Sequence, residues 1–125
     1  MEKQIEDVRM FGIQGFAKDL LEIADILEKA IESVDVETVK KSDNEQFKSL
    51  HEGLVMTDAQ LQKIFKKNGL EKINPTGQKF DPNFHEALYQ VKGDKPGFVV
   101  DVTQIGYMLH GRTIRSAKVG VNIEQ

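Results

Sequence analysis

Hydrophobic residues in the first half of the chain recur at helical spacing. From residue 13 to residue 34 they stand three or four positions apart, with mostly charged or polar residues between them. This heptad-like spacing predicts an amphipathic helix with one continuous apolar seam. The seam consists of Ile13, Phe16, Leu20, Ile23, Leu27, Ala30 and Val34.

A second helix is predicted after a polar stretch that runs from Asp35 to Glu45. Ser42 or Asp43, followed by Glu45 or Gln46, is typical of a helix start. An Asn-Gly pair at residues 68 and 69 is typical of a helix stop. The positions that repeat at alternating spacing of four and three are Leu50, Leu54, Thr57, Leu61 and Ile64.

The pattern changes near residue 70 to short apolar runs that are separated by glycine- and proline-containing turns. Strict alternation near the C-terminus marks a strand with one buried face. We therefore expect a compact, mostly antiparallel β domain over residues 71–125, after a helical dimerisation region over residues 1–70. The fold class is α+β. The predicted strands are residues 71–74, 87–91 and 98–103, a hairpin of 107–109 with 112–114, and residues 117–123.

Two amphipathic helices of this length share one seam and cannot enclose a core by themselves. A second copy of the chain would complete the core as a four-helix bundle across a two-fold axis. We therefore expect a homodimer. The alternative is that the β half of the same chain covers the apolar stripe.

Composition and charge exclude several classes of protein. The net charge is −3, and there is no cysteine. The sequence therefore indicates neither a nucleic-acid-binding face nor a disulfide or thiolate site. No apolar run is long enough for stable membrane insertion. The charged, uncapped start of the first helix leads us to expect that a longer helix continues upstream.

No residue pattern in the chain indicates catalysis. His85 and Glu86 resemble the start of a zinc-protease motif, but Tyr89 stands where the second histidine would be. The three histidines are not spaced for a shared metal, and neither a nucleophile elbow nor a phosphate-binding loop is recognisable. We expect no enzyme activity, no metal and no cofactor.

Several segments resemble the GrpE family. They are FDPNFHEALY at residues 80–89, the run from His51 to Pro82, and PGFVVDVTQIGYMLHGRTIRSAKVGV at residues 96–121. Residues 16–31 also resemble the helix that enters the family's bundle. The resemblance covers nearly the whole chain. The residues that carry it are most similar to those of the mitochondrial branch of the family.

The resemblance implies a homodimeric nucleotide exchange factor. In this family a long helix and a helical pair build a four-helix bundle. A small β domain docks on the ATPase domain of a DnaK-type chaperone, opens its cleft and promotes ADP release. The similarity to the mitochondrial branch implies a location in the mitochondrial matrix and a mitochondrial heat-shock chaperone as the partner, although no transit peptide is present in the chain. A bacterial origin would imply the cytoplasm.

The resemblance also implies roles for individual residues. Chaperone-binding positions fall on Phe80, Arg112 and Val121, with weaker contacts at Glu32 and Ser33. The dimerisation and bundle positions are Phe16, Leu20, Ile23, Leu27, Gly53, Leu54, Leu61 and Ile64.

Other interpretations remain open at this stage. Phe80 and Val121 also fit core positions, and Arg112 also fits a solvated hairpin charge. The chain could instead be a structural coiled-coil adaptor whose β domain binds another protein, or a small ligand-binding β domain on a dimerisation stalk.

Overall fold

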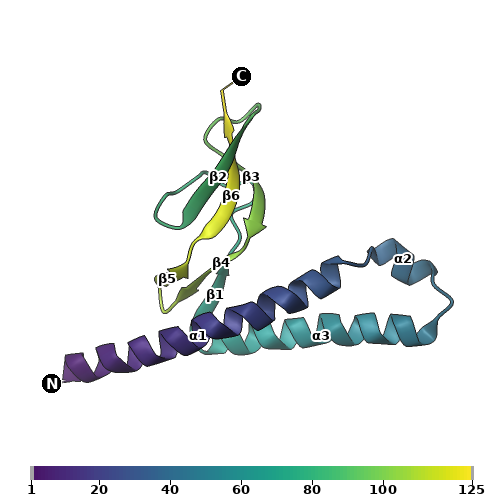
Figure 1. The fold of residues 1–125 in the computed structure, drawn as a ribbon, viewed down its shortest axis with the longest axis horizontal. Coiled ribbons are helices and arrows are strands. Elements are labelled where there is room, and N and C mark those ends of the chain that lie inside the picture. The colour runs from purple at the N-terminus through teal and green to yellow at the C-terminus, as the bar shows by residue number, and fades with distance from the viewer. Residues whose placement is uncertain (1, 125) are drawn as a thin grey trace. The chain divides into compact units, whose positions relative to one another are not determined.

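The computed structural model describes the backbone of residues 2–124 and the side chains of residues 9 and 12–124. The chain divides into two compact units, residues 1–68 and residues 69–125. Helices α1 to α3 form the first unit, and strands β1 to β6 form the second (Figure 1). Helices followed by small sheets confirm the predicted α+β class.

The helical unit is a hairpin of two long helices with a short helix at the bend. α1 (Glu2–Glu32) and α3 (Glu45–Lys67) pack side by side, and α2 (Val36–Lys41) lies between them in the chain (Figure 1). α2 falls inside the polar stretch for which the sequence predicted no helix. Its N-cap is Asp35, whose carboxylate accepts the backbone N–H of Glu37 at 3.3 Å. Six residues are too few to produce a recognisable period.

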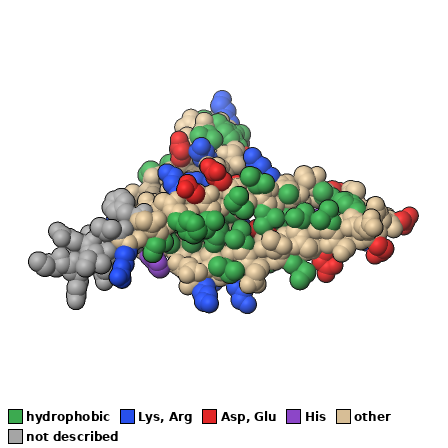
Figure 2. Space-filling model, turned by 60° about the horizontal axis from the view of Figure 1, so that its bottom comes forward, with side chains coloured by type: hydrophobic (Ala, Val, Ile, Leu, Met, Phe, Trp, Pro, Cys, Tyr) green, Lys and Arg blue, Asp and Glu red, His purple; other side chains and the backbone are tan. Residues whose placement is uncertain are grey.

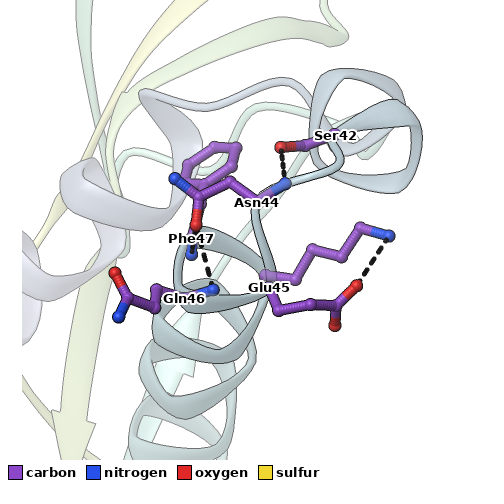
Figure 3. A network of polar contacts seen from close by, with 6 residues as sticks. Ser42, Asn44, Glu45, Gln46 and Phe47 are labelled. Carbon is purple, nitrogen blue, oxygen red and sulfur yellow. Dashed lines mark hydrogen bonds and ion pairs between the residues drawn. The ribbon is translucent and has the colours of Figure 1, made fainter.

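The N-terminus of α3 is capped by Asn44, which is one residue after Asp43 and two after Ser42, the two predicted start positions. The Asn44 Oδ1 accepts the backbone N–H groups of Gln46 at 3.0 Å and Phe47 at 3.1 Å (Figure 3). Ser42 contributes differently, because its Oγ accepts the backbone N–H of Asn44 at 3.1 Å. The cap therefore satisfies two backbone donors that an α-helix leaves without partners.

Asn44→Ala should lower the free energy of unfolding by about 1 kcal/mol, because two backbone donors lose their acceptor. Asn44→Asp keeps an acceptor oxygen and should retain most of the stability. Urea unfolding followed by circular dichroism would measure both variants. Equal stability of Asn44→Ala and the unaltered chain would show that this cap contributes nothing.

The face of α1 that packs within the helical unit is not the predicted seam. It is formed by Ala17, Leu21 and Ala24, which are 6%, 1% and 2% exposed. Phe16 and Ile23, from the predicted seam, are 67% and 59% exposed. The described part of α1 therefore carries two apolar faces, and one of them is covered within the helical unit.

The β unit contains two three-stranded sheets. In the first, β1 (Leu70–Ile73) pairs with β4 (Gly106–Leu109), and β4 pairs with β5 (Arg112–Arg115), all antiparallel. This confirms the hairpin that was predicted around residues 110 and 111.

The second sheet has the order β2-β6-β3 and holds the core of the β unit. β6 (Ala117–Ile123) pairs antiparallel with β3 (Val99–Gln104) and parallel with β2 (His85–Lys92). The parallel pair qualifies the expectation of a mostly antiparallel domain without overturning it. The buried cluster is Val99, Ala117, Val119 and Val121, with Ile73, Phe80 and Val102 packed against it.

Candidate functional site

Arg112 stands at the tip of the hairpin that β4 and β5 form. His110 and Gly111 connect the strands with φ angles of 49° and 79°, which is the left-handed conformation of a tight two-residue hairpin turn. Arg112 follows directly, pairs with Leu109 in the ladder, and is exposed. Its guanidinium has no partner within the described part of the chain. It is therefore available to bind a carboxylate on another molecule.

The turn is fixed to the start of the β unit. The backbone N–H of His110 donates to the carbonyl of Gly69 at 2.8 Å. The His110 imidazole lies where a Cβ on Gly69 would stand, only 2.3 Å from its nearest ring atoms. Gly69 also has a φ of 82°, which favours glycine. The tip is thus held by a backbone bond and a ring contact.

Arg115 braces the base of the same hairpin. Its Nε and Nη2 donate to the carbonyl of Ile105 at 3.1 and 2.6 Å. Its guanidinium lies 5.4 Å from the centre of the Tyr107 ring, and Tyr107 is fully buried. No role was predicted for Arg115, which is the last residue of the segment GYMLHGRTIR at residues 106–115. We assign it the role of orienting the strand that carries Arg112.

Phe80 and Val121 lie together in the β core. Val121 is 8% exposed, and Phe80 is half-buried against the cluster that contains it. The backbone N–H of Phe80 donates to the carbonyl of Gly97 at 2.8 Å. Phe80 therefore combines a core contact with an exposed portion, and Val121 belongs to the buried cluster against which Phe80 packs. Direct contact of either residue with a partner stays a prediction.

His85 fixes the loop that follows Phe80. Its imidazole is 7% exposed, and its Nδ1 accepts the backbone N–H of Asp81 at 2.9 Å. The rings of Phe80 and His85 are 5.7 Å apart. Burial lowers the pKa of His85 from its ordinary value of 6.5, and the nearby Asp81 carboxylate acts in the opposite direction. The loop thus depends on a neutral imidazole, because a protonated Nδ1 cannot accept a hydrogen bond.

Acidification should destabilise the β unit through His85. Because its folded-state pKa lies below 6.5, the unfolded chain binds the proton more readily. The stabilisation is therefore present above pH 6.5 and is lost as the pH falls through the folded-state pKa. Urea unfolding between pH 7.5 and pH 5, values chosen to bracket the usual histidine range, would measure this slope. His85→Gln should reduce the slope, and an unchanged slope would contradict this assignment.

Glu32 and Ser33 belong to the helical unit. Both are exposed at the end of α1, and the Ser33 Oγ donates to the carbonyl of Ala30 at 2.7 Å. That bond is local and leaves the Glu32 side chain without a partner in the described part of the chain. Their predicted contact with a partner is untested.

The predicted bundle positions lie on the helical unit and are exposed or half-buried. Figure 2 shows hydrophobic side chains gathered in a band along the helices. An apolar groove on α3 includes Met56, Leu61 and Ile64. Gly53 is exposed, and a Cβ placed on it would meet nothing within 4 Å. Phe16, Ile23 and Ile64 are exposed, and Leu20, Leu27, Leu54 and Leu61 are half-buried.

The described residues show neither a metal-binding cluster nor a membrane span. No group of three or more histidine, aspartate or glutamate side chains there is placed to hold a metal ion. Among the same residues, no helix has both the length and the apolarity that crossing a bilayer requires.

Comparison with known proteins identifies close relatives. The sequence model of the family described as GrpE matches residues 1–123. The chain is 56% identical over 122 residues to GrpE protein homolog 1, mitochondrial, of Bos taurus, and 55% identical to the protein of that name from Homo sapiens. It is 54% identical over 125 residues to GrpE protein homolog, mitochondrial, of Drosophila melanogaster. These alignments cover 96–98% of this chain but only 56–57% of the relatives, so the chain spans slightly more than half of their length.

Proposed function

Because the chain belongs to the GrpE family, we propose that it acts as a nucleotide exchange factor and not as an enzyme. It binds the ATPase domain of a DnaK-type chaperone, opens the nucleotide cleft and promotes the release of ADP. The observation that carries this proposal is the hairpin tip. Arg112 is exposed there on a turn that is fixed to Gly69, and its side chain has no partner among the residues that the structure describes.

The proposed mechanism is differential binding, and no covalent bond changes. The β unit binds the open form of the ATPase domain more tightly than the closed, ADP-bound form. Shifting a mostly closed domain to a mostly open one needs about 5.5 kcal/mol of differential binding free energy. A few well-placed anchors can supply this amount. Arg112 provides a charge-assisted contact, and the exposed part of Phe80 provides an apolar one.

Rigidity of the docking surface is part of this mechanism. A flexible hairpin would bend on binding and would leave the cleft of the partner closed. Arg115 ties its strand to the carbonyl of Ile105 and to the buried Tyr107. His85 holds the loop beside Phe80 through its hydrogen bond with the backbone of Asp81 and its ring contact with Phe80. Both contacts favour a β unit that transmits binding energy to the partner.

We further propose that two copies of the chain associate through the helical unit. The support is the exposure of Phe16 and Ile23 on a face of α1 that α3 does not cover. A two-fold axis would place the two exposed faces against each other in a four-helix bundle. The open space at Gly53 would then be filled by the second copy.

The cellular location is proposed from the relatives. The names of the bovine, human and fly proteins include the word mitochondrial. We propose that this chain also acts in the mitochondrial matrix, on the heat-shock chaperone of that compartment.

Stopped-flow release of a fluorescent ADP analogue from a DnaK-type chaperone tests the proposal. The chain should accelerate release in a saturable way, and omission of the chaperone should give no nucleotide turnover. Unchanged release at saturating protein, together with capture of an unrelated protein by the β unit, would favour a structural adaptor instead.

A further inference from the structure

A side-chain contact joins the two outer strands of the β2-β6-β3 sheet across its central strand. Gly120 of β6 pairs with Tyr89 on β2 and with Asp101 on β3. The Tyr89 hydroxyl donates to Asp101 Oδ2 at 2.6 Å, although β6 lies between the two strands. Neighbouring strands lie about 5 Å apart, so this contact spans about 10 Å of the sheet. We call it the Tyr89–Asp101 clasp.

Gly120 makes room for the tyrosine ring. Val119 and Val121 belong to the buried core, so Gly120 between them faces the opposite side of the sheet. A Cβ placed on Gly120 would clash with the Tyr89 ring. Gly120 is buried, whereas Tyr89 is 39% exposed. The ring therefore covers the backbone of β6 at a position where a larger residue would displace it.

The clasp lies where both ladders of the sheet are irregular. β2 and β3 each carry one extra residue beside Gly120, namely Leu88 and Val100. Such a bulge leaves the extra residue unpaired and disrupts the ladder locally. Tyr89 and Asp101 directly follow these two residues in the chain. The clasp therefore connects the outer strands at the level where backbone pairing is interrupted on both sides of β6.

The same part of the sheet supports the two apolar positions that are predicted to contact the chaperone. Val121 pairs with Val99 at the start of β3. The backbone N–H of Val99 donates to the carbonyl of Gln78 at 2.8 Å, two residues before Phe80. The backbone N–H of Phe80 donates to the carbonyl of Gly97 at 2.8 Å, two residues before β3 begins. A shift of β3 against β6 would therefore change the positions of both Phe80 and Val121.

The Tyr89 hydroxyl remains a hydrogen-bond donor at neutral pH. Its hydrogen bond with Asp101 is the largest of the effects that raise the pKa of Tyr89 above the ordinary value of 10. Hydrogen bonds from a neutral donor to a carboxylate are stronger than those between two neutral groups. The clasp is therefore more than a contact between two strands that are already paired.

We propose that Tyr89 is a positioning residue for the docking surface of the β unit. By holding β2 and β3 in register on β6, the clasp sets the positions of Phe80 and Val121. Tyr89 acts through these two residues and does not itself contact the chaperone. This inference rests on the proposed exchange function.

Hydrogen exchange of the full chain without chaperone tests whether the clasp holds the sheet. Tyr89→Phe keeps the ring over Gly120 and removes the hydroxyl. The amides of Phe80 and Val99 should then exchange about fivefold faster, because one hydrogen bond no longer opposes local opening. The amide of His110, which is bonded to Gly69 beside the other sheet, should exchange at an unchanged rate. Unchanged exchange at Phe80 and Val99 would overturn the proposal.

Binding to the ATPase domain of a DnaK-type chaperone, measured by calorimetry, tests whether the clasp serves docking. Tyr89→Phe should raise the Kd about fivefold, and Asp101→Ala should match it. Asp101→Asn keeps an oxygen that accepts from the hydroxyl and should retain most of the affinity. The double variant Tyr89→Phe/Asp101→Ala should bind no more weakly than either single variant, because both substitutions remove the same bond.

Each other outcome of the binding experiment contradicts a stated part of the account. An unchanged Kd for Tyr89→Phe, additive losses in the double variant, or equal losses in Asp101→Asn and Asp101→Ala would overturn the positioning role. Failure of the unaltered chain to bind the ATPase domain would instead overturn the proposed function, and the docking role with it, even where hydrogen exchange confirms the clasp. The amide spectra of each variant report whether the β unit remains folded.

Discussion

Arg112→Ala should weaken binding of the chain to its chaperone by at least about 2 kcal/mol, on the order of thirtyfold in Kd. Acceleration of ADP release at subsaturating protein should fall accordingly. The reason is that Arg112 is exposed at the hairpin tip and its guanidinium has no hydrogen-bond or ion-pair partner among the described residues. Stopped-flow release of a fluorescent ADP analogue measures the effect.

Two controls make the Arg112 result interpretable. Lys92→Ala removes an exposed cation elsewhere in the β unit and should leave exchange unchanged. Arg112→Lys keeps the charge but loses the planar, bidentate fork, so it should show an intermediate defect. Full activity of the Arg112→Ala variant would show that the hairpin tip is not part of the docking surface. The unfolding midpoint should stay the same in all three variants.

The double variant Phe16→Glu/Ile23→Glu should convert a dimer to a monomer. In a two-fold interface each substitution occurs twice, so four carboxylates would be buried without partners. Each costs several kcal/mol, and the dimer Kd should rise on the order of a thousandfold or more. Sedimentation over a concentration series measures the change. Glutamate is a good helix former, so α1 itself should persist.

The matched control for the seam is Lys18→Glu/Lys29→Glu. Both lysines are exposed on α1 and outside the predicted seam. This variant adds even more negative charge to the helix, but it should remain dimeric because no seam position changes. A dimeric Phe16→Glu/Ile23→Glu variant, or a monomeric unaltered chain, would contradict the proposed bundle.

Local signals made the hairpin and the last strand predictable. The pair His110-Gly111 connects two apolar runs and adopts the left-handed φ angles of a tight hairpin turn. The alternation of apolar and polar residues along residues 117–123 indicates a strand with one buried face. The exposed position of Arg112 followed from the same turn. These features depend on neighbours in sequence, which a single sequence displays directly.

Features that depend on tertiary partners could not be predicted in the same way. Two faces of α1 are apolar, and only the approach of α3 determines that Ala17, Leu21 and Ala24 are the ones covered. The parallel pairing of β2 with β6 joins segments that no local pattern connects. The role of Arg115 depends on where the Ile105 carbonyl lies, which no local pattern in the sequence shows.

The central claim is that this chain prefers the open ATPase domain to the closed one, and thermodynamic linkage provides its most direct test. Calorimetry would compare the affinity of the chain for the ATPase domain without nucleotide and with saturating ADP. The account predicts that ADP weakens binding of the chain by the same factor by which the chain weakens binding of ADP. Equal affinity for the empty and the ADP-bound domain would contradict it.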